Sequence, residues 1–167
     1  MSEIAERKAA MRREIISQRK LRNSKNTEEF TKNLLALVAQ VSPNRVMVFE
    51  SFGSEPETSD FIDQVGLPVL VPVTHEDHLG FKLLDTVSET SIQPGDLLFI
   101  PALAVDKTGN RLGRGKGYFD KTLAKLPDGV KVFAVIYAAE FIDEVPTDTH
   151  DCKVDGVVTE AGIHKIN

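Results

Sequence analysis

The chain has 167 residues, a length that fits one domain with a hydrophobic core of its own. Apolar residues make up 41% and charged residues 27%, which is ordinary globular usage and argues against a disordered or fibrous chain. The formal net charge of −5 disfavours nucleic acids and anionic membranes as partners. We therefore predict a single domain over residues 1–167.

Cellular location is predicted from what the sequence lacks. The single cysteine, Cys152, has no partner for an internal disulfide, which fits a reducing compartment. The N-terminal segment carries charges every few residues, and no apolar run has the length of a signal peptide core or a membrane span. These features predict a cytoplasmic protein, and its size predicts a monomer.

Two helices are predicted at the N-terminal end of the chain. Residues 3–22 are rich in Glu, Lys, Arg, Ala and Met, which predicts a basic helix exposed to solvent. Asn26 and Glu29 resemble a capping pair at the start of a second, core-facing helix, and Pro43 ends it. The predicted core positions of the second helix are Phe30, Leu34, Leu35, Leu37 and Val38.

Short apolar runs after Pro43 predict buried strands. They cover residues 46–49, 67–73, 81–84, 97–100 and 132–137. Segments of helical character lie between them, at residues 58–65 and 118–126. Alternation of strand and helix predicts an α/β fold with helices on the faces of a sheet.

The segment after the strand at 97–100 has the composition of an anion site. Pro101 marks the exit of that strand, and ligands of open α/β sheets bind beyond the carboxyl ends of strands. Residues 107–120 then read KTGNRLGRGKGYFD, with glycines and cations closely interleaved. Backbone N–H groups at glycines can approach phosphate closely, and Arg and Lys neutralise its charge. A helix beginning near Tyr118 would add its dipole.

The glycine pattern belongs to neither of two well-known nucleotide motifs. Gly117 follows Lys116 where a P-loop has Ser or Thr, and the spacing G-x-G-x-G differs from the dinucleotide-binding fingerprint. From composition alone, a flexible, solvated basic turn is almost as good an interpretation as a polyphosphate site. The position directly after a buried strand favours the polyphosphate site.

Residues 96–123 closely resemble the signature of the 5-formyltetrahydrofolate cyclo-ligase family, also called methenyltetrahydrofolate synthetases. That signature has the form D-L-x-x-x-P-G-x-x-F-D-x-x-G-x-R-L-G-x-G-x-G-Y-Y-D-x-x-L. Other segments are similar to further family motifs. They are KAAMR at residues 8–12, EPET at 55–58, and VP, HD and VD at 145–146, 150–151 and 154–155.

The resemblance implies a fold and a reaction. The implied fold is a three-layer αβα sandwich similar to that of ribose-phosphate isomerase and CoA-transferase. The implied reaction uses ATP and Mg²⁺ to convert 5-formyltetrahydrofolate to 5,10-methenyltetrahydrofolate, ADP and phosphate. The γ-phosphoryl group activates the formyl oxygen, N10 attacks the activated carbon, and phosphate leaves.

The resemblance also assigns roles to residues of this chain. The implied ATP-binding residues are Lys8, Arg12, Arg111, Gly113, Arg114, Gly115, Lys116, Gly117 and Phe119. The implied catalytic residues are Arg114, Lys116 and Tyr118. Glu55 and Tyr118 would contact the folate, and Asp120 and Asp151 would hold Mg²⁺ as oxygen donors suited to a hard cation.

Each acidic or basic assignment has a structural alternative. Asp120 falls in the first turn of a predicted helix, where the dipole favours a carboxylate without any metal. Lys8 and Arg12 lie four residues apart, as on a solvated cationic face. Asp151 could cap a turn, and Glu55 could be a surface glutamate.

Four departures from the family pattern concern the substrate more than the nucleotide. Residues 85–95 form a short connection where family members carry a longer segment that helps to enclose the folate. Phe119 stands where a second tyrosine is common, Val105 where Phe is expected, and Glu140 where glutamine is common. Glu140 would add negative charge if it borders the anion site. These departures keep open a diverged paralogue with another acceptor, or a non-catalytic nucleotide- or folate-binding module.

Overall fold

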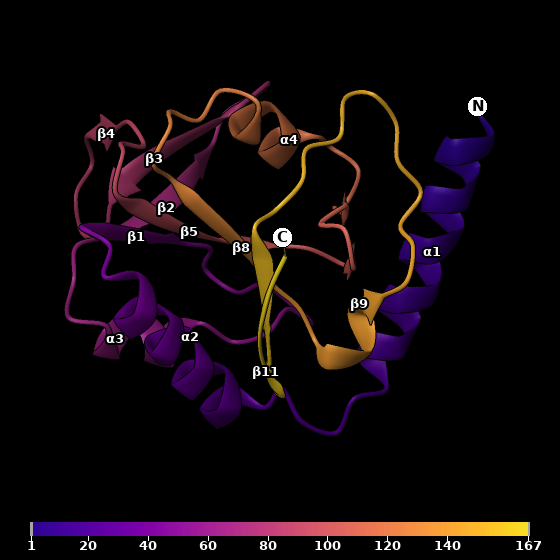
Figure 1. Ribbon diagram of the computed structural model, residues 1–167, viewed down its shortest axis with the longest axis horizontal. Coiled ribbons are helices and arrows are strands. Elements are labelled where there is room, and N and C mark those ends of the chain that lie inside the picture. The colour runs from indigo at the N-terminus through magenta and orange to yellow at the C-terminus, as the bar shows by residue number, and fades with distance from the viewer. Residues whose placement is uncertain (1, 167) are drawn as a thin grey trace.

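A central eight-stranded sheet organises the chain, of which the computed structural model describes residues 2–166 (Figure 1). The strands lie in the order β11-β10-β8-β5-β1-β2-β3-β4. The parallel strands are β1 (Arg45–Val48), β2 (Val69–Thr74), β5 (Asp96–Pro101), β8 (Lys131–Val135) and β10 (Gly156–Thr159). The antiparallel strands are β3 (Leu79–Leu83), β4 (Glu89–Thr90) and β11 (Gly162–Lys165), at the two sides of the sheet.

Strand β5 lies in the middle of the sheet because its side chains are apolar on both faces. Leu97 and Phe99 belong to the core on one face, and Leu98 and Ile100 to the core on the other. A strand buried on both sides reads as a continuous apolar run, which is the pattern that predicted it. The carboxyl end of β5 therefore lies near the middle of the row of strand ends, between the carboxyl ends of β1 and β8.

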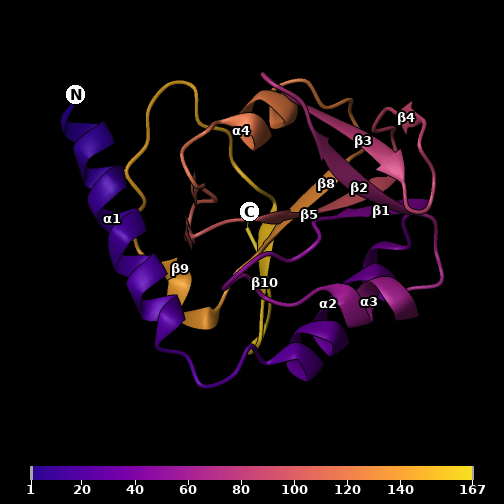
Figure 2. The ribbon, with the colours of Figure 1, turned by 180° about the vertical axis from the view of Figure 1, so that it is seen from behind.

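Helices cover both faces of the sheet, which confirms the predicted three-layer α/β fold (Figures 1 and 2). Helices α2 (Thr27–Val41) and α3 (Ser59–Gln64) cover one face. Helix α4 (Tyr118–Leu123) covers the other and ends earlier than the predicted residue 126. A helix this short contributes little dipole at its N-terminus, so the predicted contribution of its dipole to an anion site is small.

The predicted capping of α2 by Asn26 is wrong, although the start of the helix is correct. Asn26 is the N-cap, but its φ is +53° and its side chain makes no capping bond. Its Oδ1 instead accepts a hydrogen bond from Arg22 at 2.9 Å. Asparagine tolerates this left-handed conformation better than most residues.

A small second sheet supports helix α1 (Glu3–Lys20). The sheet contains β6 (Ala104–Asp106), β7 (Arg111–Leu112) and β9 (Phe141–Ile142), and the 3₁₀ helix η1 (Ala138–Glu140) precedes β9. Three apolar residues of α1, namely Met11, Ile15 and Ile16, pack against a cluster that includes Leu103 and Leu112.

The prediction that α1 is simply a solvent-exposed basic helix is therefore wrong. Two of its cations, Lys8 and Arg19, are buried. Burial of a charge is tolerated where it is paired, and both cations have carboxylate partners from segments more than 100 residues away in sequence.

No helix within residues 2–166 has the length and apolar character needed to cross a membrane.

Candidate active site

The glycine- and arginine-rich segment lies just beyond the carboxyl end of β5, between β7 and α4. Gly113 lies close to the Arg111 side chain, because a Cβ there would lie 2.9 Å from a terminal guanidinium nitrogen, which would then have to shift. Gly115 has a φ of +111°, a conformation that other residues rarely adopt. These glycines let the segment 113–117 expose its backbone above the buried Arg111.

Helix α1 places one predicted ATP-binding cation, Arg12, against this segment and another, Lys8, against the loop at residues 148–151. Arg12 Nε donates to the Gly113 carbonyl at 2.8 Å, and Gly115 lies close to the same guanidinium. Lys8 Nζ donates to Asp151 Oδ2 at 2.5 Å and to Asp148 Oδ2 at 3.3 Å. Burial alone would lower the pKa of Lys8, but its two carboxylate partners raise the pKa above its ordinary value. Lys8 is therefore a cation at neutral pH.

Arg111 lies beneath the loop and is almost fully buried. Its Nε donates to the Pro101 carbonyl at 3.1 Å, its Nη1 lies 3.8 Å from Asp120 Oδ1, and its Cζ lies 5.5 Å from the centre of the Phe119 ring. Burial lowers the pKa of Arg111, and Asp120 and Asp151 oppose that shift. Because an arginine stays protonated in proteins, a fixed positive charge lies under the segment.

Asp120 and Asp151, the predicted magnesium ligands, approach Arg111 from α4 and from the long loop before β10. Asp120 Oδ1 accepts the backbone N–H of Cys152 at 3.3 Å, and Asp151 Oδ2 accepts Lys8 and the Asp148 N–H. Within residues 2–166, no three His, Cys, Asp or Glu side chains gather as a metal site. Mg²⁺ is commonly held by one or two carboxylates together with substrate phosphates. These residues thus fit Mg²⁺ bound jointly with phosphates, not on its own.

Glu55 follows β1, the strand next to β5, and its carboxylate is buried. Its Oε1 accepts the Phe52 N–H at 2.8 Å, and its Oε2 lies 3.9 Å from Arg114 Nε. Burial raises the pKa of Glu55 above its ordinary value, although the Phe52 N–H and Arg114 oppose that shift. The surface alternative for Glu55 is wrong, because the side chain is buried and its carboxylate faces Arg114.

Two predicted catalytic residues, Lys116 and Tyr118, make no side-chain hydrogen bond to the other predicted site residues within residues 2–166. Lys116 is exposed and has no hydrogen bond or ion pair within residues 2–166. Tyr118 Oη donates to the Glu76 carbonyl at 3.2 Å, on the turn between β2 and β3. Lys121 Nζ donates to the next carbonyl of this turn, that of Asp77, at 2.9 Å. The β2–β3 turn therefore holds the start of α4.

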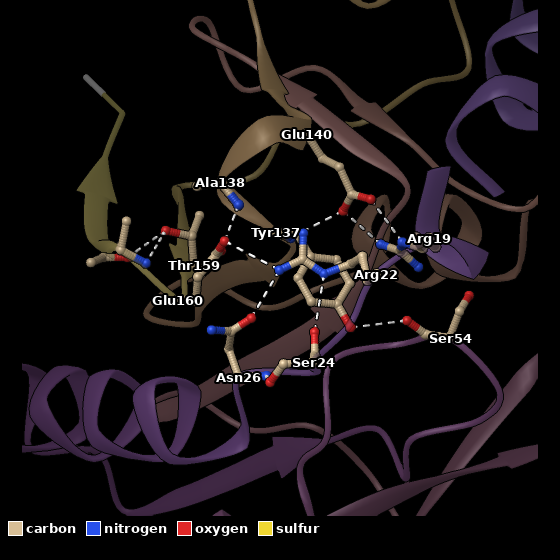
Figure 3. Close-up of polar contacts among 12 residues, drawn as sticks. Arg19, Arg22, Ser24, Asn26, Ser54, Tyr137, Ala138, Glu140, Thr159 and Glu160 are labelled. Atoms are coloured by element: carbon tan, nitrogen blue, oxygen red, sulfur yellow. Dashed lines mark hydrogen bonds and ion pairs between the residues drawn. The ribbon is translucent and has the colours of Figure 1, made fainter. Parts of the chain in front are cut away.

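Arg19 was not predicted from the sequence as a functional residue, yet it is the partner of Glu140, whose negative charge stands where glutamine is common in the family (Figure 3). Arg19 donates to both oxygens of Glu140 at 2.8 Å and to the Ala102 carbonyl at 2.8 Å. Glu140 Oε1 also accepts the Tyr137 N–H at 3.0 Å. Glu140 thus does add a buried negative charge, but Arg19 pairs with it and offsets it. No local pattern marks a pair that is 121 residues apart.

The chain is similar to proteins of one enzyme family. The model of the 5-formyltetrahydrofolate cyclo-ligase family matches residues 81–160. A Mycolicibacterium smegmatis protein named 5-formyltetrahydrofolate cyclo-ligase is 30% identical over 146 residues, which cover 72% of this chain and 75% of that protein. The chain belongs to the 5-formyltetrahydrofolate cyclo-ligase family. A mouse cyclo-ligase is 41% identical over 80 residues, which cover 44% of this chain and 39% of the mouse protein.

Solved structures confirm the fold of this cyclo-ligase family member. A methenyltetrahydrofolate synthetase from Mycoplasma pneumoniae superposes with a TM-score of 0.79 at 21% identity, over 92% of this chain and 98% of that one. The corresponding protein of Aquifex aeolicus gives a TM-score of 0.78 at 22% identity, over 96% and 93%. Membership assigns this chain to the folate-related ligase enzymes, as the signature at residues 96–123 indicated.

Proposed function

We propose that this enzyme converts 5-formyltetrahydrofolate to 5,10-methenyltetrahydrofolate with consumption of ATP and release of ADP and phosphate. The observation that carries the proposal is the 3.9 Å approach of Arg114 to Glu55. It joins a cationic, glycine-rich segment suited to phosphates to a buried carboxylate suited to an amino-pyrimidinone edge. Two such subsites in contact are what transfer of a phosphoryl group to a bound folate requires.

The chemistry proceeds in two displacements. The formyl oxygen attacks the γ-phosphorus of ATP, and ADP leaves. N10 of the folate then attacks the activated carbon, loses its proton, and phosphate departs with the former formyl oxygen. Activation is needed because the oxygen of a formamide is otherwise a very poor leaving group. Phosphoryl transfer depends mainly on positioning and charge neutralisation, which this chain supplies.

The phosphates are proposed to lie over residues 113–117, which we call the phosphate segment. Arg114 and Lys116 are exposed there and can turn toward a ligand, whereas Arg111 supplies a fixed charge from below. Gly113, Gly115 and Gly117 would bring backbone N–H groups to the phosphates. Lys8 and Arg12 would approach from α1, and Phe119 would pack beside Arg111.

Asp120 and Asp151 are proposed to hold Mg²⁺ together with the phosphates. When bound, Mg²⁺ would offset phosphate charge, as it does in other phosphoryl-transfer enzymes. Lys8 donates to Oδ2 of Asp151 and the Cys152 N–H donates to Oδ1 of Asp120, and these hydrogen bonds hold the two carboxylates in place. Each carboxylate keeps a second oxygen for the cation.

Glu55 is proposed to anchor the pterin, and Tyr118 to lie on the folate side of the phosphate segment as a substrate-binding and catalytic residue. The Glu55 carboxylate can accept paired hydrogen bonds from an amino-pyrimidinone. We further propose that residues 1–167 form one domain, which the single continuous central sheet supports, and that it acts as a cytoplasmic monomer with no nucleic-acid or membrane partner.

The deciding experiment is a spectrophotometric assay of the purified chain with 5-formyltetrahydrofolate, which follows the ultraviolet absorbance of the methenyl product. Product that requires both ATP and Mg²⁺ establishes the proposal. ATP hydrolysis that does not depend on folate would indicate another acceptor. ATP binding without any turnover would contradict the proposal and indicate a diverged paralogue.

A further inference from the structure

The aromatic ring of Tyr137 is fixed by its neighbours (Figure 3). Ile136 separates this residue from β8, η1 begins directly after it, and only 1% of its surface is exposed. Phe30 packs edge-on with 5.5 Å between ring centroids, and Arg22 Cζ lies 3.7 Å from the centre of the ring. Arg22 is itself held by Asn26 Oδ1 at 2.9 Å. The position of the phenol oxygen is therefore set by the core and by Arg22, which lies just beyond the end of α1.

That hydroxyl donates to the Ser54 carbonyl at 3.1 Å, one residue before Glu55. The other side-chain hydrogen bonds of this loop are internal: Ser51 Oγ donates to the Pro56 carbonyl, and Thr58 Oγ1 donates to the Phe49 carbonyl. Among side-chain hydrogen bonds within residues 2–166, the one from Tyr137 alone joins residues 52–55 to another part of the chain. Without this bond, the Glu55–Arg114 ion pair would be the one polar side-chain contact left, within residues 2–166, between residues 52–55 and another part of the chain.

Packing alone does not explain a tyrosine at this position. A phenylalanine ring would make the same contact with Phe30 and lie equally well under Arg22. Burial raises the pKa of Tyr137, so its hydroxyl keeps the proton that the Ser54 carbonyl needs throughout the neutral range. The hydroxyl of Tyr137 thus contributes a hydrogen bond to the loop at Ser54 and adds nothing to the packing of the core.

We propose that Tyr137 is a positioning residue of the folate subsite: its hydroxyl holds the Ser54 carbonyl and thereby sets the Glu55 carboxylate opposite Arg114. The effect on folate rests on the proposed function above. The effect on the loop does not, because it concerns hydrogen bonds that the free protein already makes.

The loop is tested without substrate by hydrogen–deuterium exchange of the full chain. Tyr137→Phe removes the hydroxyl and keeps the ring, and Thr31→Val is a matched control that removes another buried hydroxyl, one that donates to the Thr27 carbonyl within α2. We expect residues 52–55 to exchange about fivefold faster in Tyr137→Phe and at the wild-type rate in Thr31→Val, since one hydrogen bond is worth about this factor. Equal exchange in wild type and Tyr137→Phe would overturn the inference.

The link to folate is tested by steady-state kinetics. We expect Tyr137→Phe to raise the KM for 5-formyltetrahydrofolate about fivefold with the KM for ATP unchanged. In a Glu55→Gln background the same change should alter the folate KM by less than about twofold, because a residue that acts through Glu55 has nothing left to position. Additive effects, or a shift in the KM for ATP instead, would overturn the positioning role. A wild-type chain that does not turn over the folate would refute the proposed function, while the exchange experiment would still decide the loop contact.

Discussion

Arg114 Nε lies 3.9 Å from Glu55 Oε2, and this pair joins the loops that follow two neighbouring parallel strands. Glu55 follows β1, and the phosphate segment follows β5 by way of β6 and β7. Residues 59 positions apart thus meet at one sheet edge. Because Arg114 is exposed and Glu55 is buried, the arginine is the partner that can turn toward an incoming phosphate.

Neutralisation of the exposed cations should impair ATP use and leave the fold intact. In Arg114→Ala and Lys116→Ala we expect kcat/KM for ATP to fall about 10- to 100-fold, because charge-assisted contacts to phosphate are lost. The melting temperature should change by no more than about 2 °C, since exposed positions contribute little to stability. Steady-state kinetics and thermal unfolding measure the two effects.

Lys131→Ala is the matched control for these two variants. Lys131 is an exposed lysine at the first residue of β8, at the end of the sheet opposite the phosphate segment. It should keep wild-type kinetics. A cation variant that behaves like Lys131→Ala would remove that residue from the ATP site.

Asp120→Asn should raise the magnesium requirement. The amide oxygen can still accept the Cys152 N–H, so the change removes charge and not shape. We expect the Mg²⁺ concentration for half-maximal activity to rise about tenfold or more at saturating ATP. Asp128→Asn, an exposed carboxylate on the loop before β8, is the control. An unchanged Mg²⁺ requirement would mean that Asp120 does not bind the metal and only interacts with the N-terminal end of α4.

The buried Arg19–Glu140 pair should be a major determinant of stability. The side chains are 1% and 8% exposed, so Glu140→Ala leaves a buried guanidinium without its partner. We expect the free energy of unfolding to fall by about 3–5 kcal/mol, measured by urea denaturation. Glu140→Gln should cost less, because an amide oxygen still accepts from Arg19. Glu144→Ala, an exposed neighbour, should be nearly neutral; a similar loss in both alanine variants would contradict the assignment.

Long, uniform patterns in the sequence predicted their structures correctly. The apolar runs at 46–49, 67–73, 97–100 and 132–137 became β1, β2, β5 and β8, because a central strand must be apolar on both faces. Strands β4, β10 and β11 were missed, and so were β6, β7 and β9, in which two or three residues are too few for any period to be visible. The formation of these last three strands depends on α1 covering them, which is a tertiary effect.

In the candidate site, too, features formed by neighbouring residues could be predicted from the sequence, and contacts between distant residues could not. Residues 111–117 are contiguous, so their composition predicted an anion site before any fold was known. The partners of Lys8 and Arg19 come from the long loop after β9 and from η1, and nothing near either residue identifies them. Exposure of α1 was therefore overestimated, because its apolar residues are few and its buried charges look like surface charges.

Glu55 should reduce stability at neutral pH, which a pH series can show. Its pKa is raised in the folded chain above the ordinary value of 4.5, mainly by burial. The protonated carboxyl thus stabilises the fold below pH 4.5, and this contribution is lost as pH rises through the folded pKa. Glu55→Gln does not titrate, and its amide oxygen can still accept the Phe52 N–H. We therefore expect the variant to gain stability relative to wild type at pH 7, with the gain shrinking as pH falls toward 4.5.

The same substitution should raise the KM for 5-formyltetrahydrofolate about tenfold or more, because a charged acceptor of paired hydrogen bonds is lost. A more stable but less active variant would mean that the buried carboxylate is kept for binding and not for folding. Glu57→Gln, two residues along the same loop and less buried, should change neither quantity by much. Loss of stability at pH 7 in Glu55→Gln, growing as pH rises, would instead make Glu55 a structural acceptor for the loop and leave the pterin without its proposed anchor.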